Sequence, residues 1–137
     1  HKIMAINLNV GTRLPAWCTS LGRVLLAGLD DAEVKARLKA SDIRANTRHT
    51  ATDMGELLAR VQQVRRQGWA LVNQELEEGL ISIAAPVKNR AGAVVAALNV
   101  SGQANRTSAA VMKDSMLPKL RAAADEVSAL LAQTGRA

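Results

Sequence analysis

The order of elements along the chain predicts an α+β domain, in which an antiparallel sheet carries its helices segregated to one face. Helical patterns dominate the first half of the sequence, and three strand patterns then follow one another from residue 69 to 101 with no helix between them. The length of 137 residues suits one compact domain. Because Trp17 and Trp69 are the only aromatic residues, its core must be aliphatic.

The first predicted element is a strand that ends near Gly11. Ile6, Leu8 and Val10 alternate with two asparagines, which places the apolar side chains on one face of the strand. These residues lack the pattern of a signal peptide. A domain that opens directly in a strand is expected to be a segment of a longer chain.

A mostly apolar helix is predicted over residues 21–29, and its composition indicates that it is well buried. Thr19 or Ser20 suits its N-cap position, because a hydroxyl there can accept a hydrogen bond from a free backbone N–H. The polar residues 41–52 are expected to form a surface loop.

Two further helices are predicted from their starts. Asp30 with Glu33, and Asp53 with Glu56, have the spacing of a capping box. The helix that Asp53 opens ends at Gly68, since glycine is typical of helix C-termini.

The second half of the chain predicts three strands and a closing helix. The strands cover residues 69–75, 80–88 and 93–101, and the sequence NRAG between the last two is typical of a hairpin turn. A helix is expected from Thr107 onward, with a kink or restart at Pro118 because proline suits the first turn of a helix.

The two faces of this hairpin differ in composition. With a symmetric NRAG turn, Ser82 lies opposite Asn99 and Leu80 lies opposite Ser101. One face is the predicted core and carries Ile81, Ile83, Ala85, Val87, Val94, Ala96, Leu98 and Val100. The other face carries Leu80, Ser82, Ala84, Val95, Ala97, Asn99 and Ser101.

The second face has two interpretations. It meets solvent, or it is covered by something, because small apolar and hydroxyl side chains are unlike the Lys, Glu and Thr of a solvent face. A mostly apolar wall with a few convergent polar groups is what a small-molecule site needs. The inference depends on the register of the two strands.

The start of the first helix is the second candidate site. Free backbone N–H groups at Thr19, Ser20 and Leu21, together with the positive end of the helix dipole, favour an anion such as a carboxylate. Arg13 could hold the same carboxylate with two hydrogen bonds. The alternative is ordinary N-capping and a surface arginine.

Charge and composition exclude several classes of protein. The net charge is +6, but the Lys and Arg residues alternate with acids and there is no Phe or Tyr on which bases could stack, which argues against direct nucleic-acid binding. The single cysteine, Cys18, forms no intrachain disulfide and fits a reducing cytoplasm. No apolar run is long enough to predict a membrane helix.

Catalytic and metal-binding patterns are weak. His1 and His49 are the only histidines, and no Cys/His set has metal-ligand spacing, so neither a metal nor another cofactor is expected. Two of the carboxylates of Glu75, Glu77 and Glu78 could serve acid/base chemistry, but a charged turn is the common case.

Two stretches together resemble the effector-binding domain of the IclR-type transcription regulators. They are RLPAWCTSLGRVLLAGL and GWALVNQELEEGLISIAAPVKNRAGAVVAALNVSG. The second follows the family pattern with Glu75, Gly79, Ser82, Ala84, Pro86 and residues 99–102. The likeness runs from about Ile6 to Leu131 and is strongest to the pca and pob regulators of aromatic-acid catabolism.

The resemblance implies a fold and a function. The fold would be GAF-like, with a curved antiparallel sheet, helices on one face and a ligand pocket on the other. Residues 1–137 would be the effector-binding domain of a cytoplasmic regulator that forms homodimers or tetramers. It would contact DNA only through an N-terminal winged helix-turn-helix domain that is absent from this sequence. The effector would be a small carboxylate: protocatechuate, p-hydroxybenzoate or β-ketoadipate.

The resemblance and the residue patterns together predict the effector site. The family's pocket positions fall on Ser20, Leu21, Leu80, Ser82, Asn99 and Ser101. We expect Thr19 and Arg13 to join them near the ligand carboxylate and Trp17 to add apolar wall. Two alternatives remain at this point: a small hydrolase or isomerase that uses Glu75 and Ser82, and an oligomerisation module without a ligand.

Overall fold

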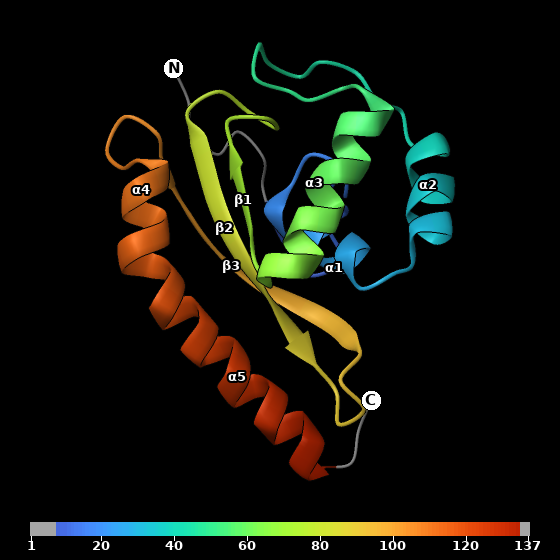
Figure 1. Ribbon diagram of the computed structural model, residues 1–137. Helices are drawn as coiled ribbons and strands as arrows, with labels where there is room; N and C mark the ends of the chain where they lie inside the picture. The colour runs from blue at the N-terminus through green and yellow to red at the C-terminus, as the bar shows by residue number, and fades with distance from the viewer. Residues whose placement is uncertain (1–7, 135–137) are drawn as a thin grey trace.

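The computed structural model describes residues 8–134, and its elements are shown in Figure 1. They are α1 (Ser20–Ala27), α2 (Asp31–Lys39), α3 (Met54–Gln67), β1 (Ala70–Asn73), β2 (Leu80–Lys88), β3 (Val94–Gln103), α4 (Ala109–Val111), the π-helical turn η1 (Met112–Met116) and α5 (Leu117–Thr134). The strands form an antiparallel sheet in the order β1-β2-β3. The α+β class is therefore confirmed.

The predicted helix starts are confirmed at each N-cap. The Thr19 hydroxyl accepts the N–H of Gly22 at 3.1 Å, and the carboxylates of Asp30 and Asp53 each accept an N–H three residues later at 2.9 Å. These side chains satisfy backbone donors that the first turn of a helix leaves without partners. At the other end of α3, Gly68 takes the left-handed conformation with φ 84°.

Helices cover both faces of the sheet. On one face α5 packs its Leu120 and Ala124 against Ile81 and Ile83 of β2, as predicted for the hairpin's core face. On the other face α1 contacts all three strands, and α3 packs on α1 (Figure 1). The pocket face thus also carries a helix, which the expectation of helices on one face did not include.

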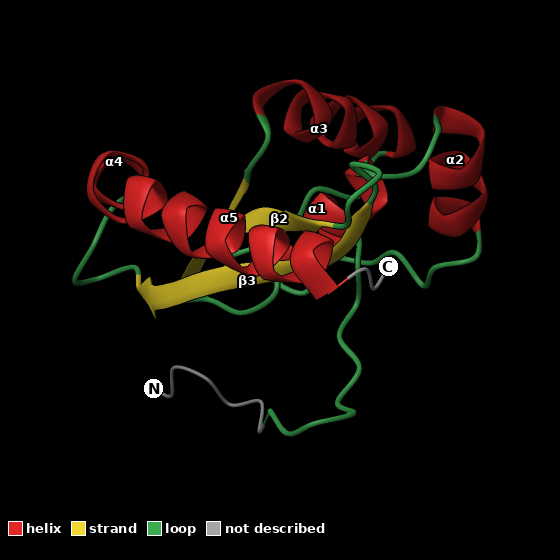
Figure 2. Ribbon diagram, turned by 90° about the horizontal axis from the view of Figure 1, so that it is seen from below, coloured by secondary structure: helices red, strands yellow, loops and turns green. Residues whose placement is uncertain are grey.

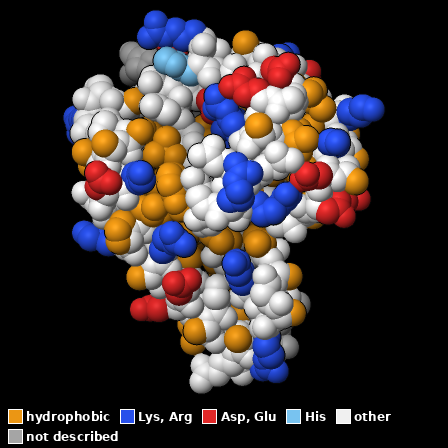
Figure 3. All heavy atoms as spheres, viewed as in Figure 1, with side chains coloured by type: hydrophobic (Ala, Val, Ile, Leu, Met, Phe, Trp, Pro, Cys, Tyr) orange, Lys and Arg blue, Asp and Glu red, His pale blue; other side chains and the backbone are white. Residues whose placement is uncertain are grey.

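The remaining helix lies away from the sheet. Figure 2 shows α2 at the edge of the molecule, beyond α1 and α3. Its buried residues Val34 and Leu38 join Trp17 and Leu26 in an aliphatic cluster. Lys and Arg side chains are interspersed with Asp and Glu over the face of the molecule that Figure 3 shows. Among the described residues, no helix combines the length and hydrophobicity that crossing a bilayer requires.

The hairpin register differs from the symmetric turn expected from NRAG. Ser82 pairs with Ser101 rather than Asn99, and Asn99 pairs with Ala84. The loop closes between Asn89 and Ala93, one residue later than expected, and a β-bulge follows at Val87/Lys88. The displacement from Leu80 to Val87 is two residues, so the side chains paired in this part of the hairpin keep their predicted faces.

Val94 is the exception to the predicted faces. It pairs with Lys88 beyond the bulge and packs with Ala84 and Ala97 on the α1 side of the sheet, instead of joining Ile81 and the core face. A bulge inserts one unpaired residue, and a single-residue shift reverses the side to which the following side chains point.

The strand expected before Gly11 is not present where the structure can test it. Ile6 lies outside the described residues. Leu8 and Val10 lie in irregular chain, because Asn9 and Thr12 close a turn with hydrogen bonds of 3.0 and 2.9 Å. The expectation of a strand is therefore wrong for this part.

The last helical segment restarts near its proline, as predicted. Pro118 is the second residue of α5, and α5 begins directly after the π-helical turn η1. A proline offers no N–H, and its ring clashes with the carbonyl four residues earlier, here that of Asp114. The wider π turn accommodates both effects.

Candidate functional site

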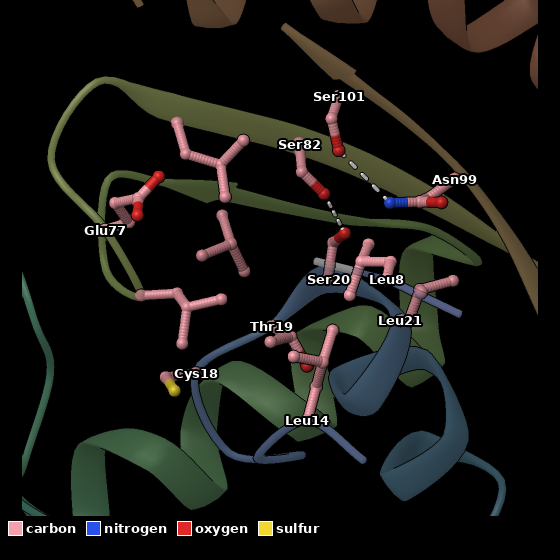
Figure 4. Close-up of a pocket in the computed structure, with 13 residues that line it drawn as sticks. Leu8, Leu14, Cys18, Thr19, Ser20, Leu21, Glu77, Ser82, Asn99 and Ser101 are labelled. Atoms are coloured by element: carbon pink, nitrogen blue, oxygen red, sulfur yellow. Dashed lines mark hydrogen bonds between the residues drawn. The ribbon is translucent and has the colours of Figure 1, made fainter. Parts of the chain in front are cut away.

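A pocket of about 620 Å³, part of it open to solvent, lies between the start of α1 and the β2–β3 hairpin (Figure 4). Its lining is mostly aliphatic with a few short polar side chains. The lining residues are Leu8, Leu14, Cys18, Thr19, Ser20, Leu21, Val72, Leu76, Glu77, Leu80, Ser82, Asn99 and Ser101.

The polar side chains come from one helix start and two strands. Ser20 opens α1, and its hydroxyl is hydrogen-bonded to that of Ser82 on β2 (Figure 4). Ser101 stands opposite Ser82 on β3 and accepts a hydrogen bond of 3.3 Å from the Asn99 amide. Ser20 and Ser82 are buried, whereas Asn99 and Ser101 are exposed. The polar group therefore extends from the closed part of the pocket to its open side.

The helix start adds backbone donors to this polar group. The Thr19 hydroxyl accepts the Gly22 N–H and donates to the carbonyl of Pro15 at 2.7 Å. The N–H groups of Ser20 and Leu21 come before the point at which helical hydrogen bonding begins, so they have no acceptor within α1. With the positive end of the helix dipole, they form a site suited to a carboxylate.

The structure brings most of the predicted site residues together. Those that line the pocket are Thr19, Ser20, Leu21, Leu80, Ser82, Asn99 and Ser101. Arg13 and Trp17 do not line it. Arg13 is exposed to solvent, and Trp17 is buried in the aliphatic cluster against α2, on the other side of the segment that leads into α1.

Several lining residues were not identified from the sequence. Val72 pairs with Ser82 across β1 and β2, a register that no motif specifies. Leu76 and Glu77 belong to the loop between these strands, and its course depends on contacts with distant segments. Leu14 precedes α1 in irregular chain. Alternation along β1 was the only signal available, and it places Val72 on the same face as Ala70.

Cys18 also lines the pocket, as a neutral thiol. Burial raises its pKa from 9.0 to about 11, although the nearby Arg23 guanidinium acts in the opposite direction. The Asn46 amide donates to its sulfur at 3.6 Å. A thiol that stays protonated at neutral pH is a weak nucleophile, so this residue contributes apolar wall.

The loop that carries Leu76 and Glu77 is attached to α1 through a buried ion pair. Arg23 and Glu75, which are 2% and 3% exposed, form two parallel hydrogen bonds of 2.9 and 2.7 Å. The Glu75 carboxylate also accepts the Ala51 N–H at 3.1 Å and an Arg60 N–H at 3.0 Å. Four donors therefore hold this carboxylate, and Glu75 is not part of the pocket lining.

Comparison with known proteins identifies the family. Residues 2–129 match the family model described as the bacterial transcriptional regulator IclR C-terminal domain. The chain belongs to this family.

The IclR relatives include regulators of aromatic catabolism. The Pca regulon regulatory protein of Pseudomonas putida is 45% identical over 127 residues, which are 93% of this chain and 44% of that protein. A transcriptional regulator from Rhodococcus sp. RHA1 superimposes with a TM-score of 0.90 at 43% identity, over 98% of this chain and 55% of that one. The chain spans about half the length of the curated relatives that it matches most strongly.

One solved IclR relative contains a ligand. The inducer-binding domain of the PobR transcription factor from Acinetobacter, a double mutant in complex with 3-hydroxybenzoic acid, superimposes with a TM-score of 0.82. It is 38% identical, over 86% of this chain and 69% of that one. The fold that we describe is therefore shared with a domain that binds an aromatic acid.

The enzymatic alternative is not favoured for this IclR domain. The curated relatives are transcription regulators. Glu75, the base that this alternative required, is occupied by Arg23, Arg60 and the Ala51 N–H rather than directed at Ser82. Within residues 8–134, no group of three or more His, Cys, Asp or Glu side chains is arranged to hold a metal ion.

Proposed function

We propose that this chain is the effector-sensing domain of an IclR-family transcription regulator, and that its effector is a small carboxylate of aromatic-acid catabolism. Protocatechuate, p-hydroxybenzoate and β-ketoadipate are the candidates. The main support is the convergence of Ser20 and Ser82 with the start of α1 in one largely aliphatic pocket. The complex of the PobR domain with 3-hydroxybenzoic acid is further support.

In the proposed complex the ligand carboxylate binds at the start of α1. It accepts the N–H groups of Ser20 and Leu21 and exchanges the hydrogen bond between Ser20 and Ser82 for bonds to its own oxygens. The ring or carbon chain lies against the aliphatic wall that includes Leu14 and Val72. Asn99 and Ser101, which are exposed, are covered by the ligand.

The proposed output is a change in subunit arrangement. The full regulator is a cytoplasmic homodimer or tetramer and contacts DNA through a separate N-terminal domain. A ligand shifts the balance between two arrangements only by its difference in affinity for them. A coupling of about 1–3 kcal/mol is typical. Here α1 and the hairpin would both contact the ligand, so a difference in how closely they approach each other is the change to which binding would couple.

The test is a calorimetric titration of the chain with the three candidate acids. We expect at least one to bind, and the Ser82→Ala variant to bind it about fivefold more weakly because it loses one hydrogen bond. Ser115→Ala is the matched control, since this exposed serine of η1 lies outside the pocket.

Three outcomes separate the hypotheses. An acid that binds should add about 2.7 kcal/mol to the free energy of unfolding when its concentration is about 100 times its dissociation constant. If none of the acids stabilises the chain, an oligomerisation module without a ligand is the better description of this domain. A chemically altered ligand would indicate an enzyme.

A further inference from the structure

The lining of the pocket includes one charged side chain among the described residues, and it is the acid Glu77. In Figure 4 Glu77 lies at the opposite end of the group of residues from Asn99, and apart from Ser20 and Ser82. The pocket therefore has two polar ends of different character. One offers backbone N–H groups and hydroxyls, and the other offers a carboxylate.

The position of Glu77 is set by the loop between β1 and β2. The Thr47 hydroxyl donates to the carbonyl of Gln74 at 2.6 Å, and the Thr50 hydroxyl donates to that of Glu75 at 2.7 Å. The carbonyl of Glu77 itself accepts the Leu80 N–H at 3.2 Å. With the buried Arg23–Glu75 pair, these bonds hold the loop in place before a ligand arrives, which is the condition for a selective contact.

Glu77 and Ser82 reach the pocket from different points along the chain. Glu77 belongs to the loop that leads into Leu80, and Ser82 lies two residues beyond Leu80, about 7 Å further along β2. Between them the wall is aliphatic, with Val72 and Leu76. An apolar body with a polar group at each end complements this arrangement.

We propose that Glu77 is a specificity-determining residue that selects a monocarboxylic acid with a hydroxyl group at its far end over a dicarboxylic acid. This inference rests on the proposed function. It narrows the effector to hydroxylated aromatic acids, with the carboxylate at the start of α1 and the ring hydroxyl donating to Glu77.

The physical reason is that an ionised carboxylate only accepts hydrogen bonds. A phenolic hydroxyl donates to it, and hydrogen bonds to a charged acceptor are stronger than those between neutral groups. A second ligand carboxylate would face a like charge in a largely apolar pocket, which costs binding free energy. Glu77 thus favours one class of acid and disfavours the other.

The experiment compares ligands that share one ring and differ at one substituent. The chain is titrated by calorimetry with benzoate, 4-hydroxybenzoate and terephthalate, and with 3-hydroxybenzoate and isophthalate for the neighbouring ring position. The variants are Glu77→Gln and, as a control with the same change of charge, Glu78→Gln. Glu78 is exposed, pairs with Arg48 and does not line the pocket.

We expect the parent chain to bind one of the hydroxybenzoates about tenfold or more tightly than benzoate, and the corresponding dicarboxylate most weakly. Glu77→Gln should reduce the advantage of the hydroxyl and strengthen dicarboxylate binding about tenfold, whereas Glu78→Gln should change neither. If Glu77→Gln binds these acids in the same order and with the same ratios of affinity as the parent chain, Glu77 does not determine specificity. The proposed effector pocket would be unaffected by that result. If none of these acids binds the folded parent chain, and protocatechuate and β-ketoadipate do not bind it either, the proposed function fails as well.

Discussion

At the scale of single residues, the space inside the pocket depends on short side chains. Ser20 and Ser82 meet although 62 positions separate them in the chain, because α1 packs its first turn on β2. Larger side chains at these two positions would fill the space that a ligand needs. Arg23 and Glu75 have a different role, since they fix the loop beside the pocket and remain outside its lining.

The thiol of Cys18 predicts a pH dependence of stability. Burial raises its pKa to about 11, whereas an unfolded thiol titrates at 9.0. Between these values the unfolded chain releases a proton that the folded chain retains, so deprotonation favours unfolding. We expect the free energy of unfolding in urea to fall as the pH rises from about 9 to 11.

The matched variant for this measurement is Cys18→Ala, which lacks the thiol. Other groups titrate in the same range, so the comparison is between the pH slopes of the two proteins rather than their absolute stabilities. Parallel slopes would show that Cys18 does not contribute.

At the scale of elements, the sequence predicted those features that depend on contacts between residues close together in the chain. The N-caps at Thr19, Asp30 and Asp53 follow from residue type and spacing, and alternation assigned most side chains of β2 and β3 to the correct face. The register was wrong because a bulge at Val87/Lys88 leaves no signature in composition.

Other features of the site were not accessible from the sequence because they depend on distant contacts. Glu77 reaches the pocket through a loop that Thr47, Thr50 and Arg23 hold from other parts of the chain. Trp17 lies two residues before Thr19, yet its burial against α2 was not visible in any periodic pattern.

The contact of α1 with the segment before it predicts the effect of one substitution. A Cβ atom at Gly22 would overlap the backbone of Ala16, which cannot move as a side chain can. We expect Gly22→Ala to cost about 1–3 kcal/mol of stability and to weaken acid binding, because the first turn of α1 must shift. Urea unfolding and calorimetry measure both effects.

Gly55→Ala is the control, in the exposed first turn of α3. Its stability should stay within about 1 kcal/mol of the parent. If the Gly22→Ala protein is as stable as this control, the first turn of α1 can move away from the backbone of Ala16 without a loss of stability.

At the scale of the whole molecule, the sheet separates two helical layers with different roles. The α5 side closes the aliphatic core, and the α1 side contains the pocket (Figure 1). In the proposed regulator, the ligand lies between α1 and the β2–β3 hairpin. We therefore expect its binding to alter the packing of α1 on the sheet.

The most direct test of the pocket's role is a crystal structure of the chain with 4-hydroxybenzoate at saturating concentration. We expect the ligand carboxylate within hydrogen-bond distance, about 2.7–3.2 Å, of the N–H groups of Ser20 and Leu21, and the hydroxyl on the Glu77 side. An acid bound elsewhere, such as in the groove between α1 and α2 beside Leu25, with the Ser20–Ser82 pocket empty, would contradict it.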